Sequence, residues 1–310
     1  MKVFTSAACL EHRVPDGFPE GRARLAGIRE RLAGDGHETI EIDLERDDGW
    51  EDRVLRLHAA DYVERFRTAV ESGRPFLDTS DNPLSPGTWG AAEAAVRAGL
   101  AAVDEVAGRG GVAFVAARPP GHHAERSMSM GFCYFNTVAV AAQHARDAHG
   151  AERVAIFDFD VHHGNGTQHL FEDRADVFYA SVHQYPFYPG TGAAGEVGIG
   201  AGVGATLNVP LPAGSGDEVY AEAHHGRIYP ALEAFRPDLL LLSAGFDAWQ
   251  RDLLGQMKVT EEGYRTWGRE LRALADGLCD GRIVAVLEGG YDLEALPGLV
   301  SAHLGGLEDG

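Results

Sequence analysis

Five short runs of apolar and β-branched residues, each ending in Gly, Pro, His or Asp, constrain the fold of this 310-residue chain most strongly. They lie at 111–117, 154–159, 177–183, 239–244 and 283–287. Between many of them are stretches rich in Ala, Leu, Glu and Arg at helical spacing, at 88–106, 137–149, 219–235 and 261–278. This alternation predicts βαβ units whose strands are buried on both faces of a mainly parallel sheet. Since no linker or internal repeat divides the chain, we predict a single α/β domain over residues 1–310.

Polar segments follow the predicted strands. Ligands of open parallel sheets bind outside the carboxyl ends of the strands. Here those ends lead into polar residues at 118–123, 158–165, 181–183, 243–247 and 288–291. A glycine-rich connection at 190–204 follows one of these ends, and long loops in compact domains are often functional. We therefore expect the functional site at this edge of the sheet, with the long loop beside it.

The segment 158–166, DFDVHHGNG, has the composition of a metal site. In an extended stretch, positions i and i+2 project to the same side, so Asp160 and His162 can reach one ion together. Asp247 is the natural third ligand, although an aspartate after a strand is also a common helix N-cap. Two aspartates and one histidine leave an open coordination position, as a catalytic metal requires. Zn²⁺ is the default ion, and Fe²⁺ is also acceptable to such a set.

The charge and the cysteines exclude several classes of protein. With 47 acidic and 27 basic side chains, the formal charge is -20, so we expect no nucleic-acid and no membrane partner. The same field would attract cationic peptides or polyamines, but solubility or adaptation to salt explains it equally well. Three distant cysteines form no disulfide framework, and no run approaches the roughly 18 apolar residues of a membrane span. The N-terminus does not resemble a secretion signal, so we expect a cytoplasmic protein.

Five motifs, RPPGHHAE, GFCYFN, DFDVHHGNGT, SAGFDA and EGGYD, resemble in sequence and order those of the zinc-dependent histone deacetylase family. The similarity extends from Pro19-Glu20 to Tyr291. It implies the arginase-deacetylase fold, a single three-layer domain with helices on both faces of the sheet. Asn165 stands where many nuclear members carry Asp, which places the chain nearer the second class and its bacterial relatives. Phe18 in place of a frequent His, and the segment 248–257, depart from the family at the rim of the site.

The resemblance also implies catalytic roles. The tandem histidines would lie beside the attacking water, with His123 the general base and later the general acid. His122 would pair with Asp158, His123 would pair with Asn165, and Tyr291 would donate its hydroxyl to the substrate carbonyl. The zinc ligands implied are Asp160, His162 and Asp247.

Further residues match the substrate channel and a monovalent cation site of the family. Phe132 and Tyr188 would form the aromatic walls around the acyl-lysine chain, and Gly121 and Gly290 would let the backbone approach the substrate. Leu254 would face the incoming chain at the rim, where polyamine-specific relatives carry a carboxylate. A structural K⁺ ion would be bound by the side chains or carbonyls of Asp158, Asp160, His162, Ser181 and Val182.

We expect a zinc hydrolase that removes acetyl or another short acyl group from the ε-amine of lysine in proteins or peptides. A small acylated amine is the alternative substrate, which would make the protein an acetylpolyamine amidohydrolase. A non-catalytic acyl-lysine binder or acetoin-utilisation accessory protein is a third possibility, which the presence of Tyr291, His122 and His123 disfavours. Two-metal ureohydrolase chemistry would need further acidic ligands. The sequence leaves the oligomeric state unknown.

Overall fold

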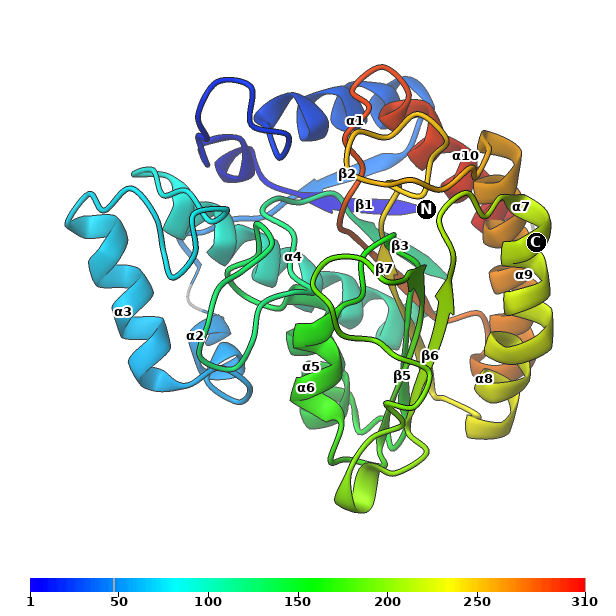
Figure 1. Cartoon of the computed structure of the whole chain (residues 1–310). Coiled ribbons are helices and arrows are strands. Elements are labelled where there is room, and N and C mark those ends of the chain that lie inside the picture. Colours follow the sequence, from blue (N-terminus) through cyan, green and yellow to red (C-terminus); the bar gives the residue numbers. More distant parts are fainter. Residues whose placement is uncertain (47, 310) are drawn as a thin grey trace.

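The computed structural model describes residues 1–46 and 48–309, and it is built on one sheet of eight strands (Figure 1). Every described strand pair is parallel. The strands lie side by side in the order β2-β1-β3-β8-β7-β4-β5-β6. Their bounds are β1 Lys2–Thr5, β2 Glu38–Glu41, β3 Val112–Val115, β4 Val154–Asp158, β5 Val177–Gln184, β6 Thr206–Leu211, β7 Leu239–Ala244 and β8 Ile283–Leu287.

Helices cover both faces of this sheet, so the molecule has three layers (Figure 1). One face carries α4 and α5, which pack on each other, together with the shorter α2, α3 and α6. The other carries α9 and α10, which pack closely together, with α1, α7 and α8. The bounds are α1 Arg22–Gly34, α2 Trp50–Val54, α3 Ala60–Glu71, α4 Thr88–Arg109, α5 Thr137–His149, α6 Asn165–Phe171, α7 Asp217–Ala223, α8 Tyr229–Phe235, α9 Glu261–Cys279 and α10 Leu296–Asp309. Short 3₁₀ turns occupy Ala7–Leu10 and Gly200–Gly202.

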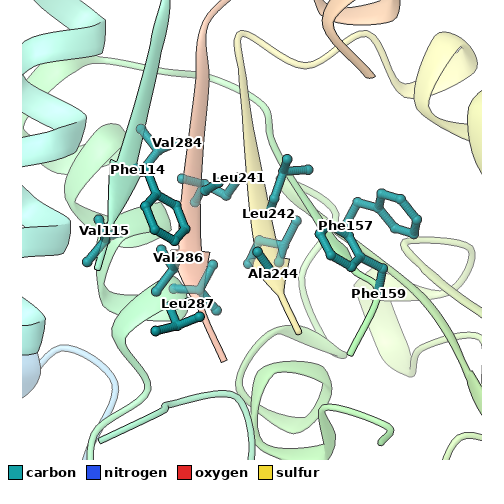
Figure 2. Packing of buried hydrophobic residues seen from close by; sticks show 14 of the residues in the cluster. Phe114, Val115, Phe157, Phe159, Leu241, Leu242, Ala244, Val284, Val286 and Leu287 are labelled. Carbon is teal, nitrogen blue, oxygen red and sulfur yellow. The ribbon is translucent and has the colours of Figure 1, made fainter. Parts of the chain in front are cut away.

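The central strands are buried on both faces, as their continuous apolar sequences predict. Figure 2 shows side chains of β3, β8, β7 and β4 filling the middle of the molecule, among them Phe114, Val286, Leu242 and Phe157. The predicted single α/β domain with a parallel sheet is therefore confirmed. Within the described residues, no helix combines the length and apolar character needed to cross a membrane.

Two features of the fold differ from the expectation. The predicted helix at 219–235 is divided into α7 and α8 by a π-helical turn at His224–Ile228. Pro230 lies in the first turn of α8 and lacks the N–H that an uninterrupted α-helix would need there. The outer strands β1, β2 and β6 were not predicted, because β1 and β2 have only four residues each, β2 is largely exposed, and β6 is interrupted by Asn208 and Pro210.

The parallel arrangement places the carboxyl ends of all eight strands at one edge. The polar segments that follow β3, β4, β5, β7 and β8 therefore meet there. The loop at 190–204 is fixed beside them, since His183 Nε2 lies 2.9 Å from the carbonyl oxygen of Gly192. His163 Nδ1 also lies 2.8 Å from the hydroxyl oxygen of Thr191.

Candidate active site

Three side chains from the ends of two neighbouring strands converge on one point. Asp160 and His162 follow β4 and Asp247 follows β7, and these strands pair with Asp158 opposite Ser243. His162 Nδ1 lies 3.1 Å from Asp160 Oδ1 and 3.2 Å from Asp247 Oδ2. One ligand atom from each of the three lies within 4.8 Å of the other two. All three are buried, so the structure brings the predicted metal ligands together.

The electrostatics of this triad fit a cation. Oδ1 of Asp247 accepts from the Val161 N–H, whereas its Oδ2 has His162 Nδ1 at 3.2 Å and no well-directed hydrogen bond within residues 1–46 and 48–309. Burial and repulsion from Asp160 raise the pKa of Asp247 to about 7. Burial opposes charge on His162, but the two carboxylates outweigh it and raise the pKa of His162 to about 10. Two buried carboxylates thus require positive charge between them, and a divalent ion bound by oxygen and imidazole would supply it.

Two glycines allow the carboxylates to approach each other. A Cβ atom on Gly289, just after β8, would lie 2.1 Å from Asp247 Oδ2 and 2.5 Å from Asp160 Oδ2. A Cβ atom on Gly245, just after β7, would lie 2.2 Å from Asp160 Oδ2. The Gly289 N–H also donates to Asp160 Oδ2 at 2.8 Å. The backbone therefore forms part of the wall around the metal ligands, and any larger residue would displace them.

The tandem histidines after β3 have different partners. His122 Nδ1 lies 3.1 Å from Asp158 Oδ2, and His123 Nδ1 lies 2.7 Å from Asn165 Oδ1. The two rings are 4.0 Å apart between centroids. Asn165 Nδ2 donates to Glu125 Oε1 at 2.5 Å, which fixes the amide so that its oxygen faces His123. One histidine is thus paired with a charged group and the other with a neutral one.

The surroundings shift the pKa values of the two imidazoles in opposite directions. Burial disfavours charge on His122, but Asp160 and Asp158 outweigh it and raise the pKa of His122 to about 10. Burial and the positive charge of His122 hold the pKa of His123 well below its usual range. With the Nδ1 proton of His123 donated to its amide partner, Nε2 keeps a free lone pair. His123 is therefore the member of the pair that can accept a proton.

Tyr291, just after β8, is buried, and contacts fix both its ring and the backbone of its loop. Its N–H donates to Asp252 Oδ2 at 2.6 Å, and the guanidinium of Arg24 lies 4.8 Å from the ring centroid. Arg24 Nε also donates to the carbonyl oxygen of Gly290 at 2.6 Å, which fixes the same loop. Burial raises the pKa of Tyr291 well above its usual value, so the hydroxyl remains a donor at neutral pH.

A cavity of about 260 Å³ connects these groups with the surface. Three of the residues that line it, Phe132, Tyr188 and Leu254, are those that the sequence predicts for the channel. The ring of Tyr188 lies 5.2 Å from that of His123, at right angles to it. The complete lining is Asp81, His123, Gly131, Phe132, His162, Phe187, Tyr188, Leu254 and Tyr291.

Sequence reasoning missed Phe187 and Asp81 in this lining. The ring of Phe187 stacks on that of His162, with centroids 5.4 Å apart. Asp81 Oδ2 accepts from the Gly131 N–H at 3.0 Å and the Tyr188 hydroxyl at 3.3 Å, and Oδ1 is buried without a hydrogen-bond partner among the described residues. Both residues lie in loops outside the family motifs, where periodicity gives no signal.

The two glycines predicted to face the substrate are not among the channel-lining residues. A Cβ atom on Gly121 would lie 2.7 Å from the backbone nitrogen of Thr137, and one on Gly290 would lie 2.7 Å from Leu296 Cδ1. Gly290 also has a φ of 120°. Packing within the protein thus accounts for both glycines, and a close approach to the substrate stays a prediction.

Glu288, at the end of β8, holds the loop of the tandem histidines. Its Oε2 accepts from the N–H groups of Gly121 at 2.7 Å and His122 at 3.2 Å. Ser243 donates to Oε1 at 3.3 Å. Glu288 belongs to the polar strand end at 288–291, but its sequence context predicts no specific role for it. The side chain of Glu288 is fully buried, and its hydrogen bonds connect the ends of β3, β7 and β8.

The residues predicted to bind a monovalent cation lie on the adjacent strands β4 and β5 and in the segment that follows β4. Asp158 at the end of β4 pairs with Ser181 in β5, and Val182 follows. Tyr179 donates its hydroxyl to Asp158 Oδ2 at 3.1 Å, and Ser181 Oγ lies 2.8 Å from His183 Nδ1. Oxygen atoms of the predicted set thus come from two neighbouring strands, and binding of K⁺ stays a prediction.

Comparison with known proteins agrees with this geometry. The histone deacetylase domain family matches residues 18–307. Histone deacetylase 14, chloroplastic, of Arabidopsis thaliana is 38% identical over 317 residues, covering 96% of this chain and 74% of that protein. The crystal structure of the HDA15 HD domain has a TM-score of 0.90 at 36% identity, covering 98% of this chain and 90% of that one. Acetylpolyamine aminohydrolase from Burkholderia pseudomallei has a TM-score of 0.88 at 30% identity, covering 99% and 98%. The chain therefore belongs to the histone deacetylase domain family, whose members are zinc-dependent hydrolytic deacetylases.

Proposed function

We propose that this protein is a zinc-dependent amidohydrolase that removes acetyl or another short acyl group from the ε-amine of lysine in peptides or proteins. The observation that carries the proposal is the position of His123 at the inner end of an aromatic channel, with its Nδ1 2.7 Å from Asn165 Oδ1, beside a triad suited to a divalent ion. Amide hydrolysis needs a base for the water, a proton for the leaving amine and a donor for the oxyanion. In this site His123 would supply the base and the proton, and Tyr291 would supply the donor.

The proposed roles follow from the positions and hydrogen-bond partners of the side chains. His123 would accept the proton of the attacking water at Nε2 and deliver it to the departing ε-amine. Tyr291 would donate its hydroxyl to the carbonyl oxygen as negative charge develops there. His122, kept charged by Asp158, would add positive charge beside the reacting carbon. A zinc ion held by Asp160, His162 and Asp247 would polarise the carbonyl and lower the pKa of the water.

The metal is tested separately from the activity. Asp160→Ala removes one of three ligands, so we expect its zinc content to fall toward zero while the far-UV circular dichroism spectrum is kept. Reconstitution of the native chain with Zn²⁺ or Fe²⁺ will show which ion supports the faster rate. Wild-type zinc content in the variant would refute the ligand assignment.

The structural K⁺ is a second metal proposal. Asp158, Ser181 and the carbonyl oxygens of Asp160, His162 and Val182 are hard oxygen donors, which suit a monovalent cation that would hold the ligand segment in place. Exchange of K⁺ for a large organic cation should lower thermal stability. An unchanged melting temperature would argue against the ion.

Two observations support acyl-lysine in a peptide as the substrate. Leu254 offers only apolar contact at the channel wall. A much larger cleft of about 1020 Å³ shares Tyr291 with the channel and is bordered by Arg13, Arg22 and Arg251. A peptide extending from the channel would enter this cleft, whereas a short acetylated amine would make no contacts with it.

One observation favours the alternative, acetylpolyamine hydrolysis. Asp81 lines the channel, and its carboxylate, whose Oδ1 has no hydrogen-bond partner among the described residues, could accept from the ammonium of a polyamine as well as from a peptide N–H. The structural similarity to an acetylpolyamine aminohydrolase has the same implication.

The experiment that decides between these substrates compares their kcat/KM values with one zinc-loaded preparation of the protein. The substrates are acetyl-lysine peptides, the same peptides with longer acyl groups, acetyl-lysine alone and acetylspermidine. We expect the peptides to be the best substrates, and acetyl-lysine alone to be poorer because it leaves the cleft empty. A preference for acetylspermidine would support the alternative, and no turnover of any substrate would leave acyl-lysine binding as the function.

A further inference from the structure

Two histidines and one aspartate form a second cluster on the helices of one face. Asp104 lies on α4, and His144 and His149 lie on α5. The Nε2 atoms of the two imidazoles approach the same oxygen, Asp104 Oδ1, at 2.8 Å for His144 and 2.6 Å for His149. Their rings are 5.5 Å apart and perpendicular. One possible ligand atom from each residue lies within 4.8 Å of the other two.

The cluster is separate from the candidate active site. Thr137, the first residue of α5, packs against the loop of the tandem histidines through Gly121. His149 is the last residue of that helix, and thirteen residues of α-helix extend about 20 Å. The cluster therefore lies near the opposite edge of the sheet, where it contributes nothing to the channel.

Burial of one ligand and exposure of the others make this an accessible, preformed site. The side chain of His144 is only 8% exposed, so packing fixes its Nε2. The side chains of Asp104 and His149 are 56% and 30% exposed, so an ion can enter and keep water in its remaining positions. Both Nε2 atoms are already directed at the same carboxylate oxygen, and the exposed side chains of Asp104 and His149 can separate slightly to admit an ion.

We propose that Asp104, His144 and His149 bind a divalent transition-metal ion such as Zn²⁺, Co²⁺ or Ni²⁺. Two imidazole nitrogens and one carboxylate oxygen are the ligands these ions prefer, whereas Mg²⁺ and Ca²⁺ favour oxygen alone. The ion would replace the two Nε2 protons that now face the carboxylate, and each imidazole would carry its proton on Nδ1. Bound there, it connects α4 with α5 and stabilises the fold without changing the chemistry of the channel.

Metal stoichiometry tests this site. The untagged protein is dialysed against Zn²⁺ or Co²⁺, and bound metal is measured for the native chain, His149→Gln and the control His225→Gln. His225 is also an exposed histidine next to a carboxylate, Glu270 at 3.1 Å, but among the described residues it belongs to no group of three possible metal ligands. We expect His149→Gln to bind one ion fewer than the native chain and the control to bind the same number as the native chain. Added metal should also raise the melting temperature of the native chain more than that of His149→Gln.

The difference of one ion is the deciding result, whatever the catalytic site binds. Equal stoichiometry in the native chain and His149→Gln would overturn the proposal, as would an equal loss in the His225→Gln control. If His149→Gln does not fold, Asp104→Ala takes its place, since this side chain is more than half exposed. Turnover per active-site metal should be the same in all folded variants.

Discussion

Replacement of Tyr291 by phenylalanine tests the proposed oxyanion donor with little disturbance of the fold. The ring is held by the guanidinium of Arg24 at 4.8 Å and by the edge of Phe132 at 5.9 Å between centroids. The backbone is held by the bond from the Tyr291 N–H to Asp252. None of these contacts uses the hydroxyl. Tyr291→Phe should therefore keep the packing of the loop and remove a single hydrogen-bond donor.

The expected loss is that of one oxyanion donor. Such donors contribute about 10²–10³ to kcat, or about 2.7–4 kcal/mol. Since burial keeps the pKa of Tyr291 well above neutrality, the native hydroxyl is protonated throughout the assay range. The loss in kcat should thus be nearly independent of pH between 6 and 8. KM should change far less than kcat, because the donor acts mainly as charge develops.

The assay is the steady-state hydrolysis of an acetyl-lysine peptide, with zinc content and thermal stability measured on the same preparations. Tyr188→Phe is the matched control, because it removes a hydroxyl from the same channel that donates to Asp81 at 3.3 Å. We expect the control to keep kcat within a few-fold of native. A kcat for Tyr291→Phe within threefold of native, at equal zinc content, would refute the role of the hydroxyl.

Three further perturbations have defined outcomes. Leu254→Glu should raise the ratio of kcat/KM for acetylspermidine to kcat/KM for acetyl-lysine peptide by about 10-fold, or about 1.4 kcal/mol. An unchanged ratio would show that Leu254 does not select the substrate. Gly289→Ala should lose zinc while keeping its helical circular dichroism, because its methyl group would lie 2.1 Å from Asp247 Oδ2; full zinc content would contradict this. Burial lowers the pKa of His224 to about 3, so the unfolded chain takes up this proton below about pH 6.5 and the folded chain does not. The free energy of unfolding therefore decreases as the pH falls. Between pH 7 and 5, the native protein should lose about 2 kcal/mol more of this free energy than His224→Phe, as measured by urea unfolding. The same pH dependence in both proteins would contradict the argument.

The central strands were predictable from the sequence because they are apolar on both faces. β4, β7 and β8 have continuous apolar sequences that no amphipathic helix or half-exposed strand would have. β6 contains Asn208 and Pro210 and lies at the edge of the sheet, where a strand tolerates proline. Its pairing with β5 depends on tertiary contacts that local patterns do not contain.

The residues of the candidate site that follow the ends of strands were predictable from the sequence, and those in other loops were not. Asp160, His162 and Asp247 were expected to meet because parallel strands end at one edge, and they do. Asp81 lies in a turn-rich loop between α3 and α4, and only the three-dimensional course of that loop brings it to the channel. The opposite pKa shifts of the tandem histidines also depend on burial and partners that the sequence alone does not show.

The order of strands in the sheet has a consequence for synthesis of the chain. β8 and β7 are the last two strands in sequence, yet they lie between β3 and β4 at the centre of the sheet. While the ribosome has released only the first 235 residues, β3 and β4 lack the neighbours that separate them in the native fold. Exposed apolar strand edges of this kind are prone to aggregation. We therefore expect the nascent chain to need chaperone protection until β8 emerges, and the metal site to assemble only after β7 and β8 have joined the sheet.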